Sequence, residues 1–162
     1  MIQKSTPARN EAGTPAALFR VLHEEYKFTV DVCASPHNAK LPGYWSVEDN
    51  GLAMPWEGHR VWCNPPYRDI TPWVNRGPEA ELAVFLLPSR TDRFWWMRWK
   101  PLVECHYFVG EKPERRIQFV RPPGVPPEEW KSNSMSNVLF VVGAEAIPGK
   151  EVWRSGIDGR RL

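Results

Sequence analysis

The sequence has no hydrophobic run that approaches the ~20 apolar residues a membrane-spanning helix needs. Its first residues also lack the apolar stretch of a secretory signal peptide. The net charge is only +2 over 162 residues, so the chain as a whole is not a polybasic binder of nucleic acid. These absences predict a cytoplasmic protein without membrane contacts, whose nucleic-acid contacts would come from local clusters of basic residues.

Cysteines are few and odd in number: Cys33, Cys63 and Cys105. They lie far apart, and neither they nor the four histidines have the short spacings of a metal site. Each cysteine lies beside residues that favour β-strands, which is typical of buried thiols. We therefore expect three buried thiols and no metal site.

The composition is that of an ordinary globular protein, with 42% hydrophobic and 25% charged residues. Residues 1–12 are polar and aperiodic, which predicts a disordered N-terminal tail. The remainder, residues 13–162, has a length that suits one domain with one sizeable core. Within it, a polar, proline-rich insert is predicted near residues 111–136.

Hydrophobic patterns predict strands that alternate with short helices, which is typical of an α/β fold with a mainly parallel sheet. Thr14 is the expected N-cap of the first helix and Pro15 its first residue. Residues 34–57 have no clear period and predict a long ordered loop. The continuous apolar run 82–87 indicates a strand buried on both faces. The expected helices are 15–26, 70–76 and 92–100, and the expected strands are 28–33, 60–63, 82–87, 106–109, 117–120 and 138–142.

The most informative motif is Asn64-Pro65-Pro66-Tyr67, directly after the apolar strand 60–63. This motif suits methyl transfer to a planar amino nitrogen, whose lone pair is delocalised. The side-chain oxygen of Asn64 and the carbonyl of Pro65 would accept its two hydrogens and so localise the lone pair. Prolines hold that carbonyl rigidly and donate no competing hydrogen bond, and Tyr67 offers an aromatic face for stacking. The alternative is a plain proline turn, since Asn and Pro favour turns; the preceding strand favours the functional interpretation.

Around this motif the chain resembles the small phage-type, Dam-like DNA N6-adenine methyltransferases. The resemblance runs from about Thr14 to Val142, with its pieces in the family's order. The matching pieces are Thr14-Pro15 with Leu18-Phe19, the run 28–35, Asn38-Ala39, the run 48–52, Trp56, the run 61–67, the run 86–92, Trp95-Trp96, Gly110, the run 117–119 and the last apolar strand.

The resemblance implies a trimmed, Rossmann-like methyltransferase sheet with helices on both faces. It also implies S-adenosylmethionine as methyl donor and adenine in DNA as substrate, with the base flipped out of the duplex. If the chain is phage-encoded, its location would be the host cytoplasm. The donor side is expected at Thr14, Pro15, Asp31, Ala34, Asp49 and Asn64, and the target-base side at Asn64, Pro65, Pro66 and Tyr67.

Two features depart from larger methyltransferases. They carry a glycine-rich loop after the first strand, where backbone approaches the donor; here residues 33–37 contain no glycine. Only about 30 residues separate the first strand from the motif, too few for two regular βα units. Structural alternatives also exist for both donor-side carboxylates: Asp31 as a loop cap, and Asp49 as the start of an Asx-turn.

DNA contacts are expected from basic residues close to the predicted site. Arg90 follows a strand end, while Arg115, Arg116 and Arg121 belong to the insert, which is predicted to enter a groove; the alternative is a solvated hairpin. The tryptophan-rich run 95–99 has helical spacing and predicts a core stripe. Its other interpretation is a surface that stacks on single-stranded DNA.

Two other functions remain open from the sequence. A methyltransferase acting on another planar nitrogen, in RNA or in a protein glutamine, would use the same tetrapeptide. A non-catalytic, tryptophan-rich binder of single-stranded DNA would bind DNA independently of the methyl donor.

Overall fold

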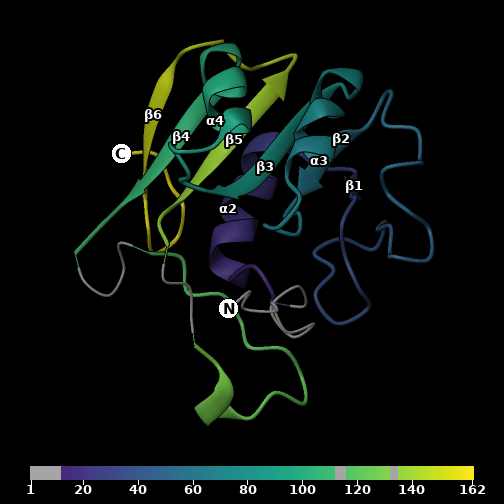
Figure 1. Cartoon of the computed structure of the whole chain (residues 1–162), viewed down its shortest axis with the longest axis vertical. Coiled ribbons are helices and arrows are strands. Elements are labelled where there is room, and N and C mark those ends of the chain that lie inside the picture. Colours follow the sequence, from purple (N-terminus) through teal and green to yellow (C-terminus); the bar gives the residue numbers. More distant parts are fainter. Residues whose placement is uncertain (1–11, 112–115, 132–134) are drawn as a thin grey trace.

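The computed structural model describes residues 12–111, 116–131 and 135–162 (Figure 1). The predicted disordered tail therefore lies outside the described residues, apart from Ala12. Parts of the predicted insert, 112–115 and 132–134, also lie outside them. In the described ranges, no helix is both long and apolar enough to cross a membrane.

Six strands form one sheet, in the spatial order β1-β2-β3-β5-β4-β6. Neighbouring strands are parallel in the pairs β1–β2, β2–β3 and β4–β6, whereas β5 is antiparallel to both β3 and β4. The sheet is thus mainly parallel, as predicted, with β5 running against the others. The strands are β1 (Val30–Asp31), β2 (Arg60–Cys63), β3 (Leu82–Pro88), β4 (Glu104–Val109), β5 (Asn137–Gly143) and β6 (Glu151–Ser155).

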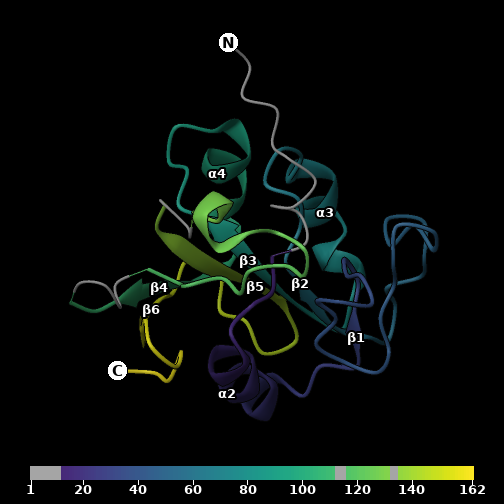
Figure 2. The same cartoon turned by 90° about the horizontal axis from the view of Figure 1, so that it is seen from below.

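Helices cover both faces of the sheet, as the resemblance implies. Figure 2 shows α2 below the sheet, with α3 and α4 above it. Short 3₁₀ turns also occur between these elements. The helices are α2 (Ala16–Tyr26), α3 (Thr71–Asn75) and α4 (Phe94–Trp99), and the 3₁₀ turns are η1 (Gly77–Glu79), η2 (Lys100–Leu102) and η3 (Pro127–Glu129).

Strand β3 is the centre of the core, since all seven of its residues are buried. Successive side chains of a strand point to opposite faces. Phe85 accordingly packs in the cluster that holds Val74 of α3 and Trp96 of α4, while Val84 packs in the cluster that holds Leu22 of α2. The prediction of a strand buried on both faces is confirmed.

The tryptophan-rich helix α4 packs against the sheet. Trp96 and Trp99 are 8% exposed, and Val103 is fully buried. Trp95 is half-buried and meets the ring of Phe140 edge-on, with centroids 5.9 Å apart. The predicted core stripe is confirmed, and these indoles are largely unavailable for stacking on DNA.

Element boundaries differ from the sequence predictions at several ends. Helix α2 has Pro15 rather than Thr14 at its N-cap, without a side-chain cap, and buried Thr14 precedes it. Strand β1 is only two residues long, although the hydrogen bonds Thr29 N–Arg60 O and Val32 N–Trp62 O extend its pairing at each end. Helix α4 begins at residue 94, without a side-chain cap from residues 91 or 92.

The C-terminal part of the sheet was harder to predict. Strand β6 carries Arg154 at a fully buried position, so it lacks the apolar alternation by which strands are recognised. The expected strand 117–120 is reduced to one bridge, between Val120 and Gly13. Tertiary pairing, which local pattern does not encode, decides both cases.

The connection from β1 to β2 is the predicted long loop, with no helix and no strand beyond an isolated bridge between Asp31 and Tyr44. It returns to the sheet at Gly51, whose carbonyl accepts a hydrogen bond from the buried Trp56 indole at 2.9 Å. A Cβ atom at Gly51 would lie 2.0 Å from the carbonyl oxygen of Val32. This loop therefore takes the place of the missing βα units and packs directly on the edge of the sheet.

The substitution Gly51→Ala should lower the free energy of unfolding by about 2–3 kcal/mol, because backbone must move to relieve the clash. Gly58→Ala is the matched control: its Cβ would meet nothing within 4 Å, and only its φ of +72° is unfavourable. That control should cost about 1 kcal/mol. Urea unfolding of both variants checks the ranking, and equal costs would contradict the close approach at Gly51.

Candidate functional site

Two strand ends meet at one edge of the sheet. In the parallel register of β1 and β2, Asp31 lies opposite Trp62, two residues before Asn64. In open α/β sheets, ligands bind beyond the carboxyl ends of the strands. The strand-end segments of β1 and β2 therefore share the edge expected to bind a ligand, at the lower side of the sheet in Figure 1.

A pocket opens at this edge, with a volume of about 250 Å³ that includes the space at its mouth. It brings together three residues expected from the sequence: Thr14 before α2, Asp31 at the end of β1 and Asn64 after β2. These residues are up to 50 positions apart in the chain. The other lining residues are Ala12, Cys33, Asn38, Lys40 and Trp62.

Asp31 is the buried carboxylate of this pocket, with 3% of its surface exposed. Its two oxygens accept hydrogen bonds from backbone amides, Oδ2 from Lys40 at 3.1 Å and Oδ1 from Cys33 at 3.4 Å. Burial raises the pKa of Asp31 to about 6, against the opposing effect of these hydrogen bonds and of the Lys40 charge. The bonds also make Asp31 a loop cap. Its carboxylate has no ion pair with any residue that the structure describes, and such a buried carboxylate suits a cationic ligand.

Thr14 reaches the pocket through pairing of the segment before α2 with the segment after β4. Gly13 and Val120 exchange two backbone hydrogen bonds, of 3.0 and 2.7 Å. Thr14 follows directly and is 2% exposed. Pro15, also expected on the donor side, caps α2 and lies outside the pocket lining.

The tetrapeptide at residues 64–67 turns away from β2 and spans two environments. Asn64 is half-buried and lines the pocket, while Pro65 is buried. The hydroxyl of Tyr67 accepts a hydrogen bond of 2.8 Å from Nδ2 of Asn137, which also donates to the carbonyl of Leu87. Asn137 thereby fixes the Tyr67 ring from the first residue of β5.

The Tyr67 ring also contacts the segment after β4. Phe119 meets it edge-on, with ring centroids 6.5 Å apart and an interplanar angle of 75°. Burial raises the pKa of the Tyr67 hydroxyl, so it stays protonated at neutral pH. The ring is therefore held by a hydrogen bond at its tip and an aromatic contact at its side.

Besides Pro15, two other residues expected on the donor side lie outside the pocket lining. Ala34 is buried, and its amide donates to the carbonyl of Trp45. Asp49 is exposed, and its Oδ2 accepts from the amide and the hydroxyl of Ser46 at 2.8 and 3.0 Å. The backbone bond from Ser46 lowers the pKa of Asp49. The observed contacts of Asp49 are those of a turn-stabilising side chain.

The basic residues expected to contact DNA differ in how they are held. Arg90 forms two hydrogen bonds of 2.9 Å with Asp92, and these bonds lower the pKa of that carboxyl to about 2. Arg121 is exposed and donates to the carbonyl of Val125. Arg116 is half-buried, and Arg115 lies outside the described residues.

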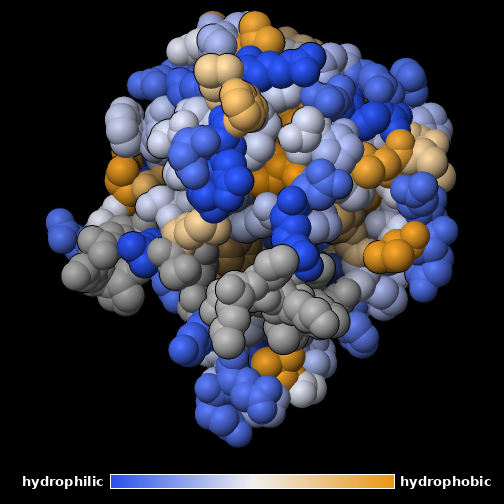
Figure 3. Space-filling model, viewed as in Figure 1, coloured by the Kyte–Doolittle hydropathy of each residue, from blue (hydrophilic) through white to orange (hydrophobic). Residues whose placement is uncertain are grey.

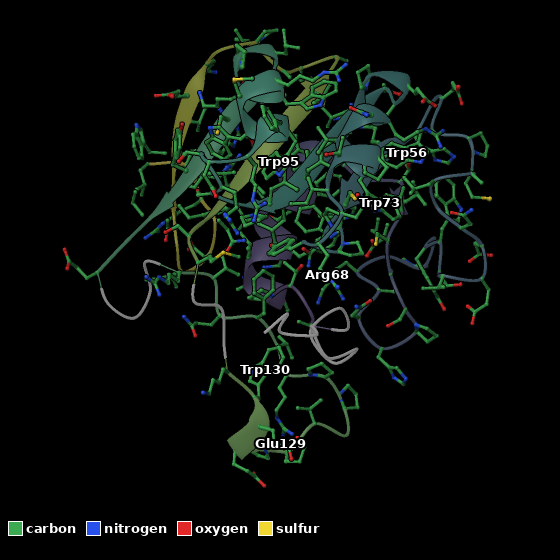
Figure 4. The ribbon with its side chains drawn as sticks, viewed as in Figure 1. Trp56, Arg68, Trp73, Trp95, Glu129 and Trp130 are labelled. Atoms are coloured by element: carbon green, nitrogen blue, oxygen red, sulfur yellow. The ribbon has the colours of Figure 1, made fainter. Side chains whose placement is uncertain are left out.

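The segment 116–131 forms the lower projection of the molecule in Figure 1. Figure 4 shows Glu129 and Trp130 on this projection, well below Trp73 and Trp95. On the same face, Figure 3 shows hydrophilic residues interrupted by small, separate hydrophobic patches.

The cysteines follow the prediction only in part. Cys63 and Cys105 are fully buried, and burial raises the pKa of both thiols. Cys33 is half-buried and lines the pocket, so the expectation of a buried thiol is wrong there. Within the described ranges, no group of three or more His, Cys, Asp or Glu side chains is arranged to hold a metal ion.

Sequence reasoning missed three polar residues at this edge: Asn38, Lys40 and Asn137. Asn38 accepts a hydrogen bond of 2.7 Å from the Ser35 amide and so shapes the loop after β1. The dipeptide Asn38-Ala39, one of the pieces that carry the family resemblance, could have pointed to this loop, and Lys40 follows it directly. Asn137 carried no signal, because it precedes the apolar strand 138–142 and its partner Tyr67 is 70 residues away.

Comparisons with known proteins found a family model and a curated relative that are similar to this chain. The family model of the DNA N-6-adenine-methyltransferases (Dam) matches residues 3–148. The curated DNA N-6-adenine-methyltransferase of Haemophilus phage HP1 (strain HP1c1) is 36% identical over 81 residues, which are 47% of this chain and 47% of that protein. The chain thus spans about half the length of the curated relative it matches. No solved structure matches the chain.

The raised pKa of Asp31 makes a testable contribution to stability. Because the carboxyl has a pKa of 3.8 when unfolded and about 6 when folded, its contribution is fully present below pH 3.8 and is lost as pH rises through 6. The loss amounts to about 3 kcal/mol. Asp31→Asn has no such titration, so between pH 4 and pH 7 the free energy of unfolding of the wild type should fall relative to that of the variant by most of this amount, about 2 kcal/mol. Denaturant unfolding at both pH values checks this, and a difference independent of pH would contradict it.

Proposed function

Because this chain belongs to the Dam family of DNA N-6-adenine-methyltransferases, we propose that it transfers a methyl group from S-adenosylmethionine to N6 of adenine in DNA. The observation that carries the proposal is the pocket in which Asn64, directly after β2, meets Asp31 and Thr14. A site of this kind has a target side and a donor side at one edge of the sheet. The tetrapeptide forms the target side, and the other residues of the pocket form the donor side.

On the target side, the two acceptors are the Asn64 side-chain oxygen and the Pro65 carbonyl. Together they accept the two hydrogens of the adenine N6 amino group, which localises the nitrogen lone pair. Pro66 follows and has no amide N–H, so the peptide unit that carries this carbonyl offers only an acceptor. The half-buried position of Asn64 and the burial of Pro65 support this role, since hydrogen bonds are stronger where water is excluded.

Tyr67 stacks on the adenine ring and sets its plane. Its hydroxyl bond with Asn137 and its contact with Phe119 restrict the ring to one orientation. A restrained aromatic surface lowers the entropy lost when a base is bound. Asn137 is thus a positioning residue that acts through Tyr67.

The donor side consists of the residues around Asp31. These residues fit S-adenosylmethionine, because the buried Asp31 carboxylate complements the ammonium group at the methionine end of that molecule. When bound, the donor would supply a methyl group on a sulfonium; the bond from sulfur to methyl breaks as the bond from nitrogen forms, and the sulfur leaves as a neutral thioether, so no covalent enzyme intermediate is needed. The chain then contributes position and electrostatics. Thr14, Pro15, Ala34 and Asp49 remain proposed donor-side residues, of which Thr14 lines the pocket.

DNA approaches the edge formed by the carboxyl ends of the strands, where the segment 116–131 also lies (Figure 2). Adenine inside a duplex does not expose N6 to this pocket, so the base is flipped out, at a cost of a few kcal/mol. Arg90, Arg115, Arg116 and Arg121 are the proposed contacts to phosphate. Of these, Arg121 belongs to the exposed residues.

Transfer of label from S-adenosylmethionine to a panel of double-stranded DNA, single-stranded DNA, RNA and protein tests the proposal. Label in DNA that digests to N6-methyladenine supports it. Label confined to RNA or protein identifies another methyltransferase and overturns it, as does DNA binding without any transfer.

Asn64→Ala should lower the rate of DNA methylation by about 10²–10³-fold, the range for a lost preorganised polar contact. The fold should survive, as measured by thermal unfolding. Asn75→Ala is the matched control: this exposed amide of α3 bonds to the Trp99 indole at 3.2 Å and lies outside the pocket. A wild-type rate in Asn64→Ala would contradict the assignment of the acceptor.

Arg121→Gln should reduce the slope of log affinity for DNA against log salt by about 1, because one phosphate contact is lost. Lys27→Gln is the control, since this exposed lysine lies between α2 and β1, at the opposite edge of the sheet. Its slope should equal that of the wild type. An unchanged slope in Arg121→Gln would remove this residue from the DNA contacts.

A further inference from the structure

The pocket contains a second charged group, which the function proposed above leaves without a role. Lys40 lines the pocket together with Asp31, in the loop that follows β1. Its backbone amide is bonded to Asp31, while its side chain is half-buried and extends toward the segment before α2. There, a Cβ atom at Gly13 would lie 3.8 Å from Nζ of Lys40.

The two charges do not neutralise each other through a direct ion pair. Among the residues that the structure describes, no carboxylate lies within 4.0 Å of the Lys40 ammonium. Burial lowers the pKa of Lys40, and the attraction of Asp31 opposes that effect. The pocket therefore presents a carboxylate and a separate ammonium, both partly removed from water.

This pair of charges has the complementary pattern of an α-amino acid, which carries one ammonium and one carboxylate on neighbouring atoms. The pocket is open to solvent, and the volume of about 250 Å³ includes the space at its mouth. The pocket thus suits one end of a donor whose remainder lies beyond its mouth.

We propose that Lys40 binds the carboxylate of the methionine end of S-adenosylmethionine, while Asp31 binds its ammonium group. The assignment rests on the function proposed above and deepens its donor side. Buried charges are stable when paired, so the donor completes the pairing of both groups at once. An adenosine without the amino-acid end would leave both unpaired.

A comparison of two ligands separates this role from a structural one. Decarboxylated S-adenosylmethionine retains the ammonium and the sulfonium and lacks only the carboxylate. Isothermal titration should give the wild type a 10- to 100-fold preference for S-adenosylmethionine, the range for a hydrogen bond to a charged group. Lys40→Met keeps roughly the length of the side chain but removes its charge. This variant should abolish the preference, because its affinity should fall only for the ligand that carries the carboxylate. Lys40→Arg should retain most of it.

Asp31→Asn is the matched variant, because it should weaken both ligands to a similar extent. If Lys40→Met also weakened both ligands equally, Lys40 would act on the shape of the pocket and the proposal would be wrong. Unchanged affinity for both ligands would overturn it as well. Binding of neither ligand to the wild type would instead refute the proposed methyl donor itself, and thermal unfolding establishes that each variant is folded.

Discussion

The parallel pairing of β1 with β2 is the constraint on which the candidate site depends. The two strands are short, and the register that sets Asp31 opposite Trp62 fixes where each of them ends. A carboxylate on one strand end and Asn64 just beyond the other thus reach one pocket. A shift of this register by one residue would turn the side chains of β1 to the other face of the sheet.

A second tertiary contact joins the two halves of the proposed site. Val120 pairs with Gly13, next to Thr14 on the donor side, and neighbouring Phe119 touches Tyr67 on the base side. The segment after β4 is therefore attached at two points, although it forms no strand. Such an attachment offers a physical route by which DNA bound to this segment would affect both the donor pocket and the stacking ring.

The long loop between β1 and β2 replaces the helices and strands that larger sheets of this kind contain. It is held by backbone contacts rather than by regular structure, as the approach of Gly51 to Val32 illustrates. The loop also delivers Asn38 and Lys40 to the pocket. A trimmed sheet thus still builds a charged pocket beside β1 without a glycine-rich turn.

Much of the fold could be predicted, because strands such as 60–63 and 82–87 are recognised from a short run of neighbouring apolar residues. The prediction worked less well for segments in which polar side chains are buried or have distant partners. Strand β6 was missed because buried Arg154 interrupts its apolar pattern, and Asn137 was missed because its partner Tyr67 lies far away in the chain. The donor-side role of Asp49, which the resemblance implies, stays a prediction; in the structure its side chain bonds to Ser46.

The sequence by itself identified the tetrapeptide at residues 64–67 as the candidate for methyl-transfer chemistry, and it located the first five strands of the sheet along the chain. Both depend on residue types and local spacing. Only the tertiary structure decided which distant side chains share the pocket, that Asn137 holds Tyr67, and that Lys40 joins Asp31 there without an ion pair. These facts depend on strand register and loop path, which arise from contacts between residues far apart in the chain.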